Sequence, residues 1–316
     1  MKSIYCILSW RLIVGLFLLT DVYGQTDTLS FLHLTDTHLI FHYDHFPQGA
    51  LRPLNPIAKS VEQFVHFFQT DPIVADSKMV MITGDMIDFY ETGDRKKDMF
   101  SFQIQQFASI PEISQIPVFC VLGNHDVATY AINEKNWYQF VDEPDWFASQ
   151  INVGKARAEW IRNVPCFADG IWYNHVYHIG QTVYRFIFLD NSTGPSKSPY
   201  LGNEQLDWLK DQLEQSPDEV KILFMHKPFS TELITDPAGN LFYALLTQHP
   251  SVKLIVAGDE HRNVIDKFDG TGFIQVETAS FGYDGAGSWR LIRLTADKII
   301  VSSAGTKQTE LSIPIK

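Results

Sequence analysis

The chain has 316 residues, of which 45% are hydrophobic, so it can build one large domain or two ordinary ones around a substantial core. Its formal net charge of -12 argues against a surface that holds nucleic acid or anionic lipid by bulk electrostatics. An acidic protein that handles an anionic substrate needs local positive charge, and bound metal ions are one source of it.

The first 24 residues have the pattern of a secretory signal peptide. Lys2 and Arg11 precede an apolar run from Leu12 to Leu19, and residues 22–24 have the spacing of a cleavage site. The run is well short of the roughly 20 apolar residues that a membrane-spanning helix needs. We therefore expect a signal peptide over residues 1–24, no membrane span in the mature chain, and a secreted or periplasmic protein.

The chain has 3 cysteines, and Cys6 lies within the expected signal peptide. Cys120 and Cys166 could pair in an oxidising compartment. Alternatively, Cys120 is a small hydrophobic residue without a partner inside a buried strand, which is the interpretation we favour.

Strands and helices alternate in the first part of the mature chain. Apolar runs predict buried strands at residues 29–34, 79–82 and 118–122, and apolar residues at helical spacing predict helices at 57–69 and about 97–108. This alternation is typical of an α/β protein. Each strand ends in polar residues, and ligand sites of α/β proteins lie at the carboxyl ends of such strands.

Residues 127–174 interrupt the alternation and are rich in aromatic side chains. The segment could be a cap over the site, or a satellite hydrophobic cluster that only folds the insertion. It contains an expected amphipathic helix at 155–162 and the aromatic residues Trp137, Tyr138, Phe140, Trp146, Phe147, Trp160, Trp172 and Tyr173.

The remaining elements continue without a repeat or a linker. We expect a hairpin at 175–179 and 183–189, a helix at 202–213, strands at 221–225 and 251–257, and several short strands between 272 and 315. Residues 25–316 are therefore expected to form a single domain that carries the insertion.

Polar clusters follow five of the expected strands. Their oxygen and nitrogen donors suit Mn, Fe, Zn or related ions, and two metal ions would explain why so many donors are present. The clusters are Asp36-x-His38, Gly84-Asp85-x-x-Asp88, Gly123-Asn124-His125-Asp126, His226 and Gly258-x-x-His261.

This ordered set resembles the calcineurin-like metallophosphoesterase family, whose pattern is Asp-x-His, Gly-Asp-x-x-Asp, Gly-Asn-His-Asp/Glu, a later His, and Gly-His-x-His. The resemblance covers residues 29–261. It implies a four-layer α/β/β/α sandwich of two mixed sheets. It also implies hydrolysis of a phosphodiester or small phosphomonoester by a hydroxide bound to two metal ions, which could be Mn, Fe, Zn or Mg.

The same resemblance assigns roles to individual residues. It implies that Asp85 bridges the two ions, that His125 lies beside the leaving group, and that Asp126 orients the ring of His125. Asp88 would be a structural or supporting residue. The other implied ligands are Asp36, His38 and His261 for the first ion, and Asn124 and His226 for the second.

Asp259 is a departure from the family pattern, because it stands where the family has the first histidine of the last block. Its carboxylate can bind a hard cation, but it has a shorter reach than an imidazole and adds negative charge. We therefore expect the second site to be looser, water-bridged, or biased towards Mn or Mg. The alternative function is a non-catalytic or weakly active protein that binds a phosphate ligand with an impaired second metal site.

Other residues have weaker cases for a role in the site. Purple acid phosphatases have a tyrosine ligand at the position of Asp88, so we expect no iron site of that kind. His33 is expected to be a packed core histidine. Five further residues could contact phosphate or face solvent: His42, His45, Arg52, Lys227 and Arg262.

Overall fold

The computed structural model describes most of the chain beyond the expected signal peptide. The described residues are 27–42, 57–88, 102–110, 113, 115–127, 130–131, 139–140, 146–193, 201–230, 240–268, 270–283 and 287–315. The expected signal peptide, His45, Arg52, Trp137 and Tyr138 lie outside these ranges. Within them, no helix combines the length and the apolar character that crossing a membrane requires.

The first sheet contains the three strands whose apolar runs were predicted in the first part of the chain. Its order is β14-β13-β12-β1-β2-β3. Strands β1, β2 and β3 are parallel, whereas β12 pairs antiparallel with β1, so the sheet is mixed. The bounds are β1 Thr28–Leu34, β2 Met79–Thr83, β3 Val118–Val121, β12 Arg290–Thr295, β13 Lys298–Ser302 and β14 Thr309–Pro314.

The second sheet has the order β10-β11-β9-β8-β7-β6 and is also mixed. Strands β7, β8, β9 and β11 are parallel neighbours, and antiparallel strands flank them. The bounds are β6 Tyr173–Ile179, β7 Thr182–Phe188, β8 Val220–Phe224, β9 Val252–Ala257, β10 Val264–Lys267 and β11 Ile274–Glu277. A separate short pair joins β4 (Tyr130–Ala131) and β5 (Gln139–Phe140).

An aromatic core joins the two sheets. The ring of Phe31 in β1 lies 5.5 Å from that of Phe186 in β7 and 5.6 Å from that of Phe224 in β8. Phe119 in β3 stacks on Phe188 in β7. These large rings bury much apolar area between the sheets, which accounts for the tight face-to-face packing.

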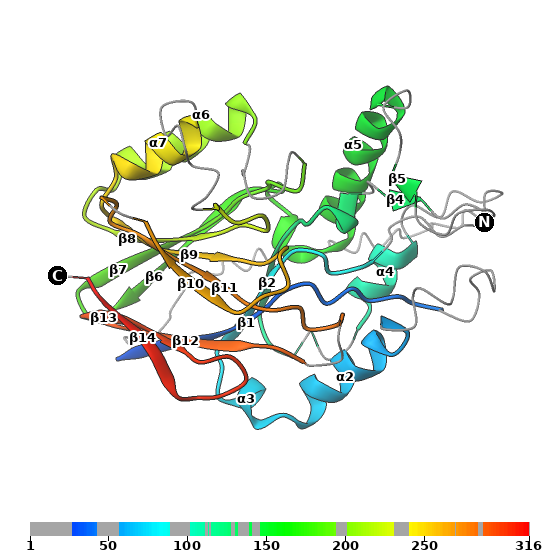
Figure 1. Ribbon diagram of the computed structural model, residues 1–316, viewed down its shortest axis with the longest axis horizontal. Coiled ribbons are helices and arrows are strands. Elements are labelled where there is room, and N and C mark those ends of the chain that lie inside the picture. Colours follow the sequence, from blue (N-terminus) through cyan, green and yellow to red (C-terminus); the bar gives the residue numbers. More distant parts are fainter. Residues whose placement is uncertain are drawn as a thin grey trace, which may run out of the picture.

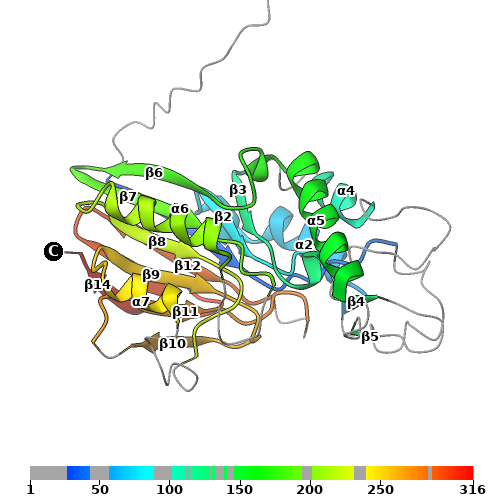
Figure 2. The ribbon, with the colours of Figure 1, turned by 90° about the horizontal axis from the view of Figure 1, so that it is seen from above.

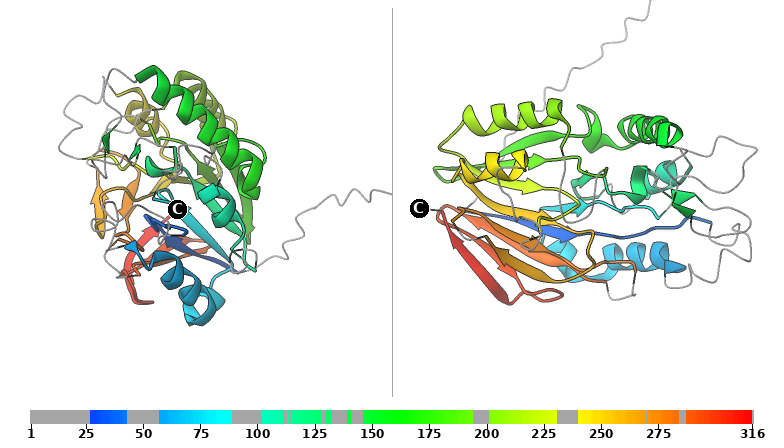
Figure 3. Two further views of the ribbon diagram at one scale, coloured as in Figure 1. Left: turned by 90° about the vertical axis from the view of Figure 1, so that its right-hand side faces the viewer. Right: turned by 45° about the horizontal axis from the view of Figure 1, so that its top comes forward.

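Helices cover the outer faces of both sheets (Figures 1 and 3). Helices α2 (Ser60–Thr70) and α3 (Pro72–Ala75) lie outside the first sheet, and α6 (Asn203–Glu214) and α7 (Leu241–Thr247) lie outside the second. The prediction of a four-layer α/β/β/α sandwich is therefore confirmed.

The described part of the insertion is continuous with the main core. Helix α5 spans Trp146–Asn163, longer than the expected 155–162, and lies near α4 (Phe102–Ala108) at one end of the sandwich (Figure 2). Trp160 is fully buried in the core cluster that includes the strands of both sheets. A 3-10 turn, η6 (Pro165–Phe167), then leads to β6, whose first residue is Tyr173. This part of the segment is thus not a satellite cluster.

Helices α2 and α7 also differ from the sequence expectation. Helix α2 begins at Ser60 rather than Ile57, because residues 57–59 form a turn before it. Helix α7 was not predicted, because its sequence LFYALLT is almost uniformly apolar and shows no helical period. The side chain of Asn240 caps its first turn by accepting a hydrogen bond from the Tyr243 N–H.

His33 is a packed core histidine, as predicted. It is fully buried in β1, and its ring nitrogens lie 2.7 Å from Thr278 Oγ1 and 2.8 Å from Thr83 Oγ1. Burial, aided by the positive charge of Arg290, lowers its pKa from 6.5 to about 3. The folded protein therefore keeps a neutral ring where the unfolded chain takes up a proton.

We predict that His33 makes folding stability pH-dependent between its unfolded pKa and its folded pKa. Because the folded pKa is depressed, its stabilising contribution is present above pH 6.5 and is lost as the pH falls towards 3. Relative to His33→Asn, the unfolding free energy of the native chain should fall by about 2 kcal/mol between pH 7.5 and pH 5. Urea unfolding at the two pH values measures this. A difference that does not change with pH would contradict the assignment.

Candidate metal centre

The structure brings together the polar residues that follow five strands. These residues lie beyond the carboxyl ends of β1, β2 and β3 in the first sheet and of β8 and β9 in the second. Backbone hydrogen bonds join the loops to one another. The Asp36 N–H donates to Gly84 O at 3.0 Å, and the Gly258 N–H donates to His226 O at 2.9 Å. The Asp259 N–H crosses between the sheets to Asp36 Oδ2 at 3.1 Å.

A first group of donor atoms comprises Asp36, His38 and His261. His261 Nε2 lies 3.3 Å from Asp36 Oδ1 and 3.2 Å from His38 Nε2. Asp36 Oδ2 is already engaged, because it accepts hydrogen bonds from Thr35 Oγ1 and the Asp259 N–H. Asp36 Oδ1 is buried and has no hydrogen-bond partner in the described part of the chain. Such an oxygen is costly unless a cation or a proton meets it.

A second group converges on His226. Its Nε2 lies 3.1 Å from Asn124 Oδ1, 3.2 Å from Asp259 Oδ1 and 3.4 Å from Asp85 Oδ2. Its Nδ1 donates to the Thr83 carbonyl oxygen at 2.7 Å, so in the neutral ring Nε2 carries a lone pair. That lone pair would face three oxygen acceptors. The group is therefore arranged to surround a cation, and Asp259 contributes an oxygen to it.

Asp85 lies between the two groups. Its Oδ2 is 3.9 Å from His38 Nε2 and 3.4 Å from His226 Nε2. Its Oδ1 accepts a hydrogen bond from the His125 N–H at 2.9 Å, which fixes the orientation of the carboxylate. One oxygen thus holds the neighbouring loop while the other faces both groups.

The residues present fit metal ions in both chemistry and spacing. Donor atoms bound to one ion at about 2.0–2.2 Å lie roughly 3–3.6 Å apart, close to the separations within each group. Three trios of Asp and His residues each bring one donor atom per residue within 4.8 Å of the others. The trios are Asp36–His38–His261, His38–Asp88–His125 and Asp36–Asp85–His226.

The backbone at these residues is strained. Five candidate ligands have left-handed φ angles: Asp36 (51°), His38 (44°), Asp85 (49°), Asp259 (68°) and His261 (51°). Among the described residues only one other non-glycine residue, His42, shares this conformation. Each instance costs roughly 1–2 kcal/mol, and strain of this kind gathers at functional sites. The fold therefore holds these side chains in place at the expense of local stability.

Glycines allow the ligand loops to approach closely. Gly84 has a φ of 91°, and a Cβ there would lie 2.4 Å from His226 Nδ1. A Cβ on Gly258 would lie 1.9 Å from Thr35 Oγ1 and 2.6 Å from Asp36 Oδ2. The glycines of these two blocks are thus required by packing as well as by turn geometry.

The charges of the side chains in the centre compensate one another. Burial raises the pKa of Asp85. The nearby imidazoles, of which His226 has the largest effect, outweigh burial and hold the pKa of Asp85 well below its usual value. Conversely, burial lowers the pKa of His226, but the Asp85 charge and the Asp259 hydrogen bond raise it well above 6.5. Protonated imidazoles therefore neutralise carboxylates that a metal ion could neutralise instead.

The predicted contact between Asp126 and the His125 ring is not formed, which corrects the sequence expectation. Asp126 Oδ1 accepts from the Ile87 N–H at 3.1 Å, and Oδ2 accepts from the Gly123 N–H at 2.8 Å. The short 3-10 turn η4 (His125–Val127) directs this carboxylate into the loop. Asp126 therefore holds the turn together, and burial with the nearby Asp85 charge raises its pKa to about 8.

Asp88 makes the contact that was expected of Asp126. The Nδ1 atom of His125 donates to the Asp88 carbonyl oxygen at 2.8 Å and lies 3.2 Å from Asp88 Oδ1. The same Oδ1 atom lies 2.9 Å from His38 Nδ1. Because Asp88 occupies the Nδ1 side of both rings, their Nε2 atoms are left to face the centre.

Sequence reasoning missed two residues that shape the centre. Tyr283 lies over the first group, with its ring centroid 5.2 Å from those of both His38 and His261. Asn191 Oδ1 accepts hydrogen bonds from the backbone N–H groups of His226 (3.0 Å) and Lys227 (3.1 Å). The polar triplet 190–192 after the apolar end of β7 was a usable signal for Asn191. Tyr283 had none, because it is distant in sequence from the residues it contacts.

Three of the residues that could contact phosphate or face solvent lie in the described part of the chain, and their surroundings differ. Arg262 pairs with Glu277 through two hydrogen bonds of 2.8 and 3.1 Å. The His42 ring lies 5.3 Å from that of Phe102. Lys227 is buried, which lowers its pKa although the charges of Asp259 and Asp85 oppose that shift. Lys227 is therefore electrostatically coupled to the centre.

Comparison with known proteins agrees with this geometry. The family model described as calcineurin-like phosphoesterase matches residues 29–263. The chain is 21% identical over 285 residues to a probable cyclic nucleotide phosphodiesterase of Synechococcus sp., covering 88% of this chain and 92% of that one. It is 26% identical over 137 residues to a probable glycerophosphodiester phosphodiesterase (GpdQ) of Arcobacter nitrofigilis, covering 43% of this chain and 40% of the relative.

Solved structures agree on the fold. A dimetal phosphatase from Danio rerio superimposes with a TM-score of 0.58 at 14% identity, covering 91% of this chain and 99% of that one. Taken with the family match over most of the sequence, these observations show that the chain belongs to the calcineurin-like phosphoesterase family and is a hydrolase of phosphoric ester bonds.

Proposed function

We propose that the chain hydrolyses a phosphodiester or a small phosphomonoester at a centre of two metal ions. The observation that carries this proposal is the pair of donor groups that share Asp85 Oδ2, 3.9 Å from His38 Nε2 and 3.4 Å from His226 Nε2. A carboxylate oxygen in this position is suited to a bridging role. Two divalent cations bound here would supply the Lewis acidity that activates water and stabilises charge on the phosphoryl oxygens.

The donor set favours hard or borderline cations. One ion would be held by Asp36, His38 and His261. The other would be held by Asn124, His226 and Asp259, and Asp85 would contact both ions. Carboxylate and amide oxygens suit Mn and Mg, while the imidazoles also admit Fe and Zn. Three carboxylates do not fully neutralise two divalent ions, so the loaded centre would keep positive charge in an acidic protein and attract an anionic substrate.

We assign to His125 the donation of a proton to the leaving oxygen. Its Nδ1–H is held by the Asp88 carbonyl oxygen, so the Nε2–H of the protonated ring faces the centre, 3.9 Å from Asp85 Oδ2. Burial lowers its pKa, but Asp85 and Asp88 raise it more strongly, to about 9 in the metal-free chain. A ring that is protonated and fixed in this way is suited to general acid catalysis.

Two observations favour a phosphodiester with an organic group as the substrate. Both curated relatives are named as diesterases, one for cyclic nucleotides and one for glycerophosphodiesters, which favours a phosphodiester. The half-buried Tyr283 ring beside His38 and His261 offers a wall against which an organic group could lie.

The alternative is a protein that binds a phosphate ligand with an impaired second metal site. The position of Asp259 Oδ1, 3.2 Å from His226 Nε2, favours the enzyme, because the second group then has a charged ligand of its own. Secretion remains a prediction from residues 1–24, which lie outside the described part of the chain.

We predict that Asp259→Asn selectively weakens the binding of the second ion. Asparagine keeps the shape and tolerates the left-handed backbone, but it removes the charge. Titration calorimetry with Mn²⁺ should find two ions per native chain. In the variant, the affinity for the first ion should stay the same, while the affinity for the second ion should fall at least about tenfold. The reason is that the charge of the ligands sets the affinity for hard cations. Asp76→Asn, at a surface pair with Lys307, is the matched control.

Two outcomes of that titration would contradict the proposal. A native chain that binds a single ion at saturating Mn²⁺ would exclude the dinuclear centre. Unchanged binding of both ions in Asp259→Asn would show that Asp259 is not a ligand.

We predict that the effect of His125→Ala depends on the leaving group. Turnover of an alkyl phosphodiester should fall by about 10²–10⁴-fold, because its alkoxide needs a proton, whereas a p-nitrophenyl diester should lose much less. The exposed His178 in β6 provides the control variant His178→Ala. Equal losses for both substrates would reject His125 as the proton donor. If the native chain turns over neither substrate with Mn, Mg, Fe or Zn, the proposed hydrolytic activity is rejected.

A further inference from the structure

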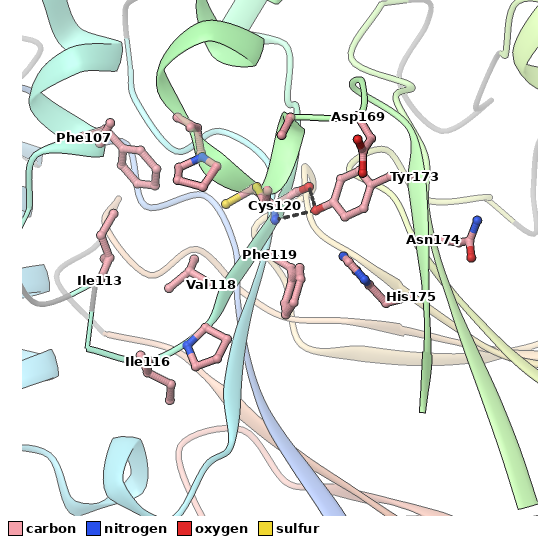
Figure 4. A pocket seen from close by; sticks show the side chains of 16 residues that line it. Phe107, Ile113, Ile116, Val118, Phe119, Cys120, Asp169, Tyr173, Asn174 and His175 are labelled. Atoms are coloured by element: carbon pink, nitrogen blue, oxygen red, sulfur yellow. Dashed lines mark hydrogen bonds between the residues drawn. The ribbon is translucent and has the colours of Figure 1, made fainter. Parts of the chain in front are cut away.

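A cavity of about 410 Å³ lies beside β3, at the end of the strand away from the metal centre. Val118, Phe119 and Cys120 from β3 line it together with Cys166 and Tyr173. Figure 4 shows Val118, Cys120 and Tyr173 around it. The metal centre begins beyond the opposite end of this strand, at Gly123. The cavity thus brings both cysteines of the expected mature chain to one place outside the active site.

The two cysteines meet at this cavity because the elements that carry them are in contact. Cys120 lies in β3 and Cys166 in η6, the strand contacts the turn, and both residues line the cavity. Tyr173 OH in turn donates to Cys120 O at 2.8 Å and accepts from the Cys120 N–H at 3.1 Å (Figure 4). Because β3 is an edge strand of its sheet, these bonds satisfy backbone groups that no neighbouring strand pairs.

The two cysteines differ in a way that suits thiol–disulfide exchange. Cys120 is buried, and burial with the neighbouring Cys166 raises the pKa of its thiol well above the ordinary value. Cys166 is only partly buried. Burial opposes ionisation of Cys166, but the neighbouring Cys120 and Tyr173 side chains lower the pKa of its thiol below the ordinary value. Cys166 is thus the more accessible and more nucleophilic of the pair.

We propose that Cys120 and Cys166 are a site of covalent modification at which a disulfide fastens the turn η6 to strand β3. In the reaction, the Cys166 thiolate attacks one sulfur of an external disulfide such as oxidised glutathione and releases one glutathione thiolate. The Cys120 sulfur then attacks the Cys166 sulfur of the mixed disulfide and releases the second. One protein S–S bond replaces two S–H bonds, and two electrons and two protons pass to the two glutathione thiols.

The disulfide would brace the insertion helix against the active site. Helix α5 runs directly into η6, and its Trp160 Nε1–H donates to Asp126 O at 2.9 Å. Its Arg157 pairs with Asp190 at 2.6 Å, next to the Asn191 that holds the His226 backbone. Fixing η6 therefore restricts the helix that supports loops on both sides of the centre. Its main effect would be on stability, because the disulfide closes the whole loop between residues 120 and 166.

Mass spectrometry of the full chain tests the proposal directly. The chain is incubated with oxidised glutathione or with dithiothreitol, unfolded, alkylated with iodoacetamide and digested. We expect the oxidised sample to yield a cross-linked peptide pair that contains Cys120 and Cys166, and the reduced sample to yield both cysteines alkylated. Alkylation of both cysteines after oxidation, or glutathione retained on Cys166 without a cross-link, would overturn the proposal.

Thermal unfolding of the same two samples tests the consequence. The oxidised native chain should unfold about 5–10 °C above the reduced chain, and Cys166→Ser should lose this difference. The value of kcat at 25 °C should be similar in both redox states, since neither cysteine lies in the metal centre. The comparison of oxidised with reduced native chain needs no variant. An oxidised chain that is cross-linked but no more heat-resistant would overturn the bracing role.

Discussion

The active site depends on one constraint, the burial of several carboxylates at the meeting point of two sheets. Asp36 and Asp85 are almost completely buried, and desolvation of both opposes their ionisation. Nearby positive charge and hydrogen bonds keep such groups ionised. In the metal-free chain the imidazoles of His226, His125 and His261 supply both. His226 and His261 would become neutral ligands if cations took over that role, so this part of the arrangement is suited to exchange protons for metal ions.

The fold meets this constraint by holding four of the donor side chains through the atom that faces away from the centre. One oxygen of Asp36 and one of Asp85 accept backbone hydrogen bonds, while the other oxygen of each faces the centre. His38 and His226 are likewise held through Nδ1, by Asp88 and by the Thr83 carbonyl oxygen. The left-handed backbone at five candidate ligands, Asp36, His38, Asp85, Asp259 and His261, adds strain that the surrounding sandwich must offset. A preorganised donor set is the result, at a cost to the stability of the fold.

Much of this was predictable from the sequence, because apolar strands that end in polar blocks mark both the sheets and the site. The α/β alternation and the convergence of the blocks followed from that pattern, whereas the α/β/β/α sandwich was implied by the resemblance of the blocks to the calcineurin-like metallophosphoesterase family. Contacts that depend on three-dimensional direction did not follow. Asp126 is adjacent to His125, yet the turn η4 sends it to the Gly123 and Ile87 N–H groups, and Asp88 meets the ring instead. Tyr283 and Trp160 reach the centre from distant parts of the chain, which local patterns cannot reveal.

The central claim is that Asp85 bridges two metal ions. Electron paramagnetic resonance of the chain loaded with Mn²⁺ tests it most directly, because two ions that share a carboxylate are magnetically coupled and two separate ions are not. At two Mn²⁺ per chain, we predict the spectrum of an exchange-coupled pair, and Asp85→Asn should remove it. A six-line signal of isolated Mn²⁺ that grows in proportion to loading would contradict the account.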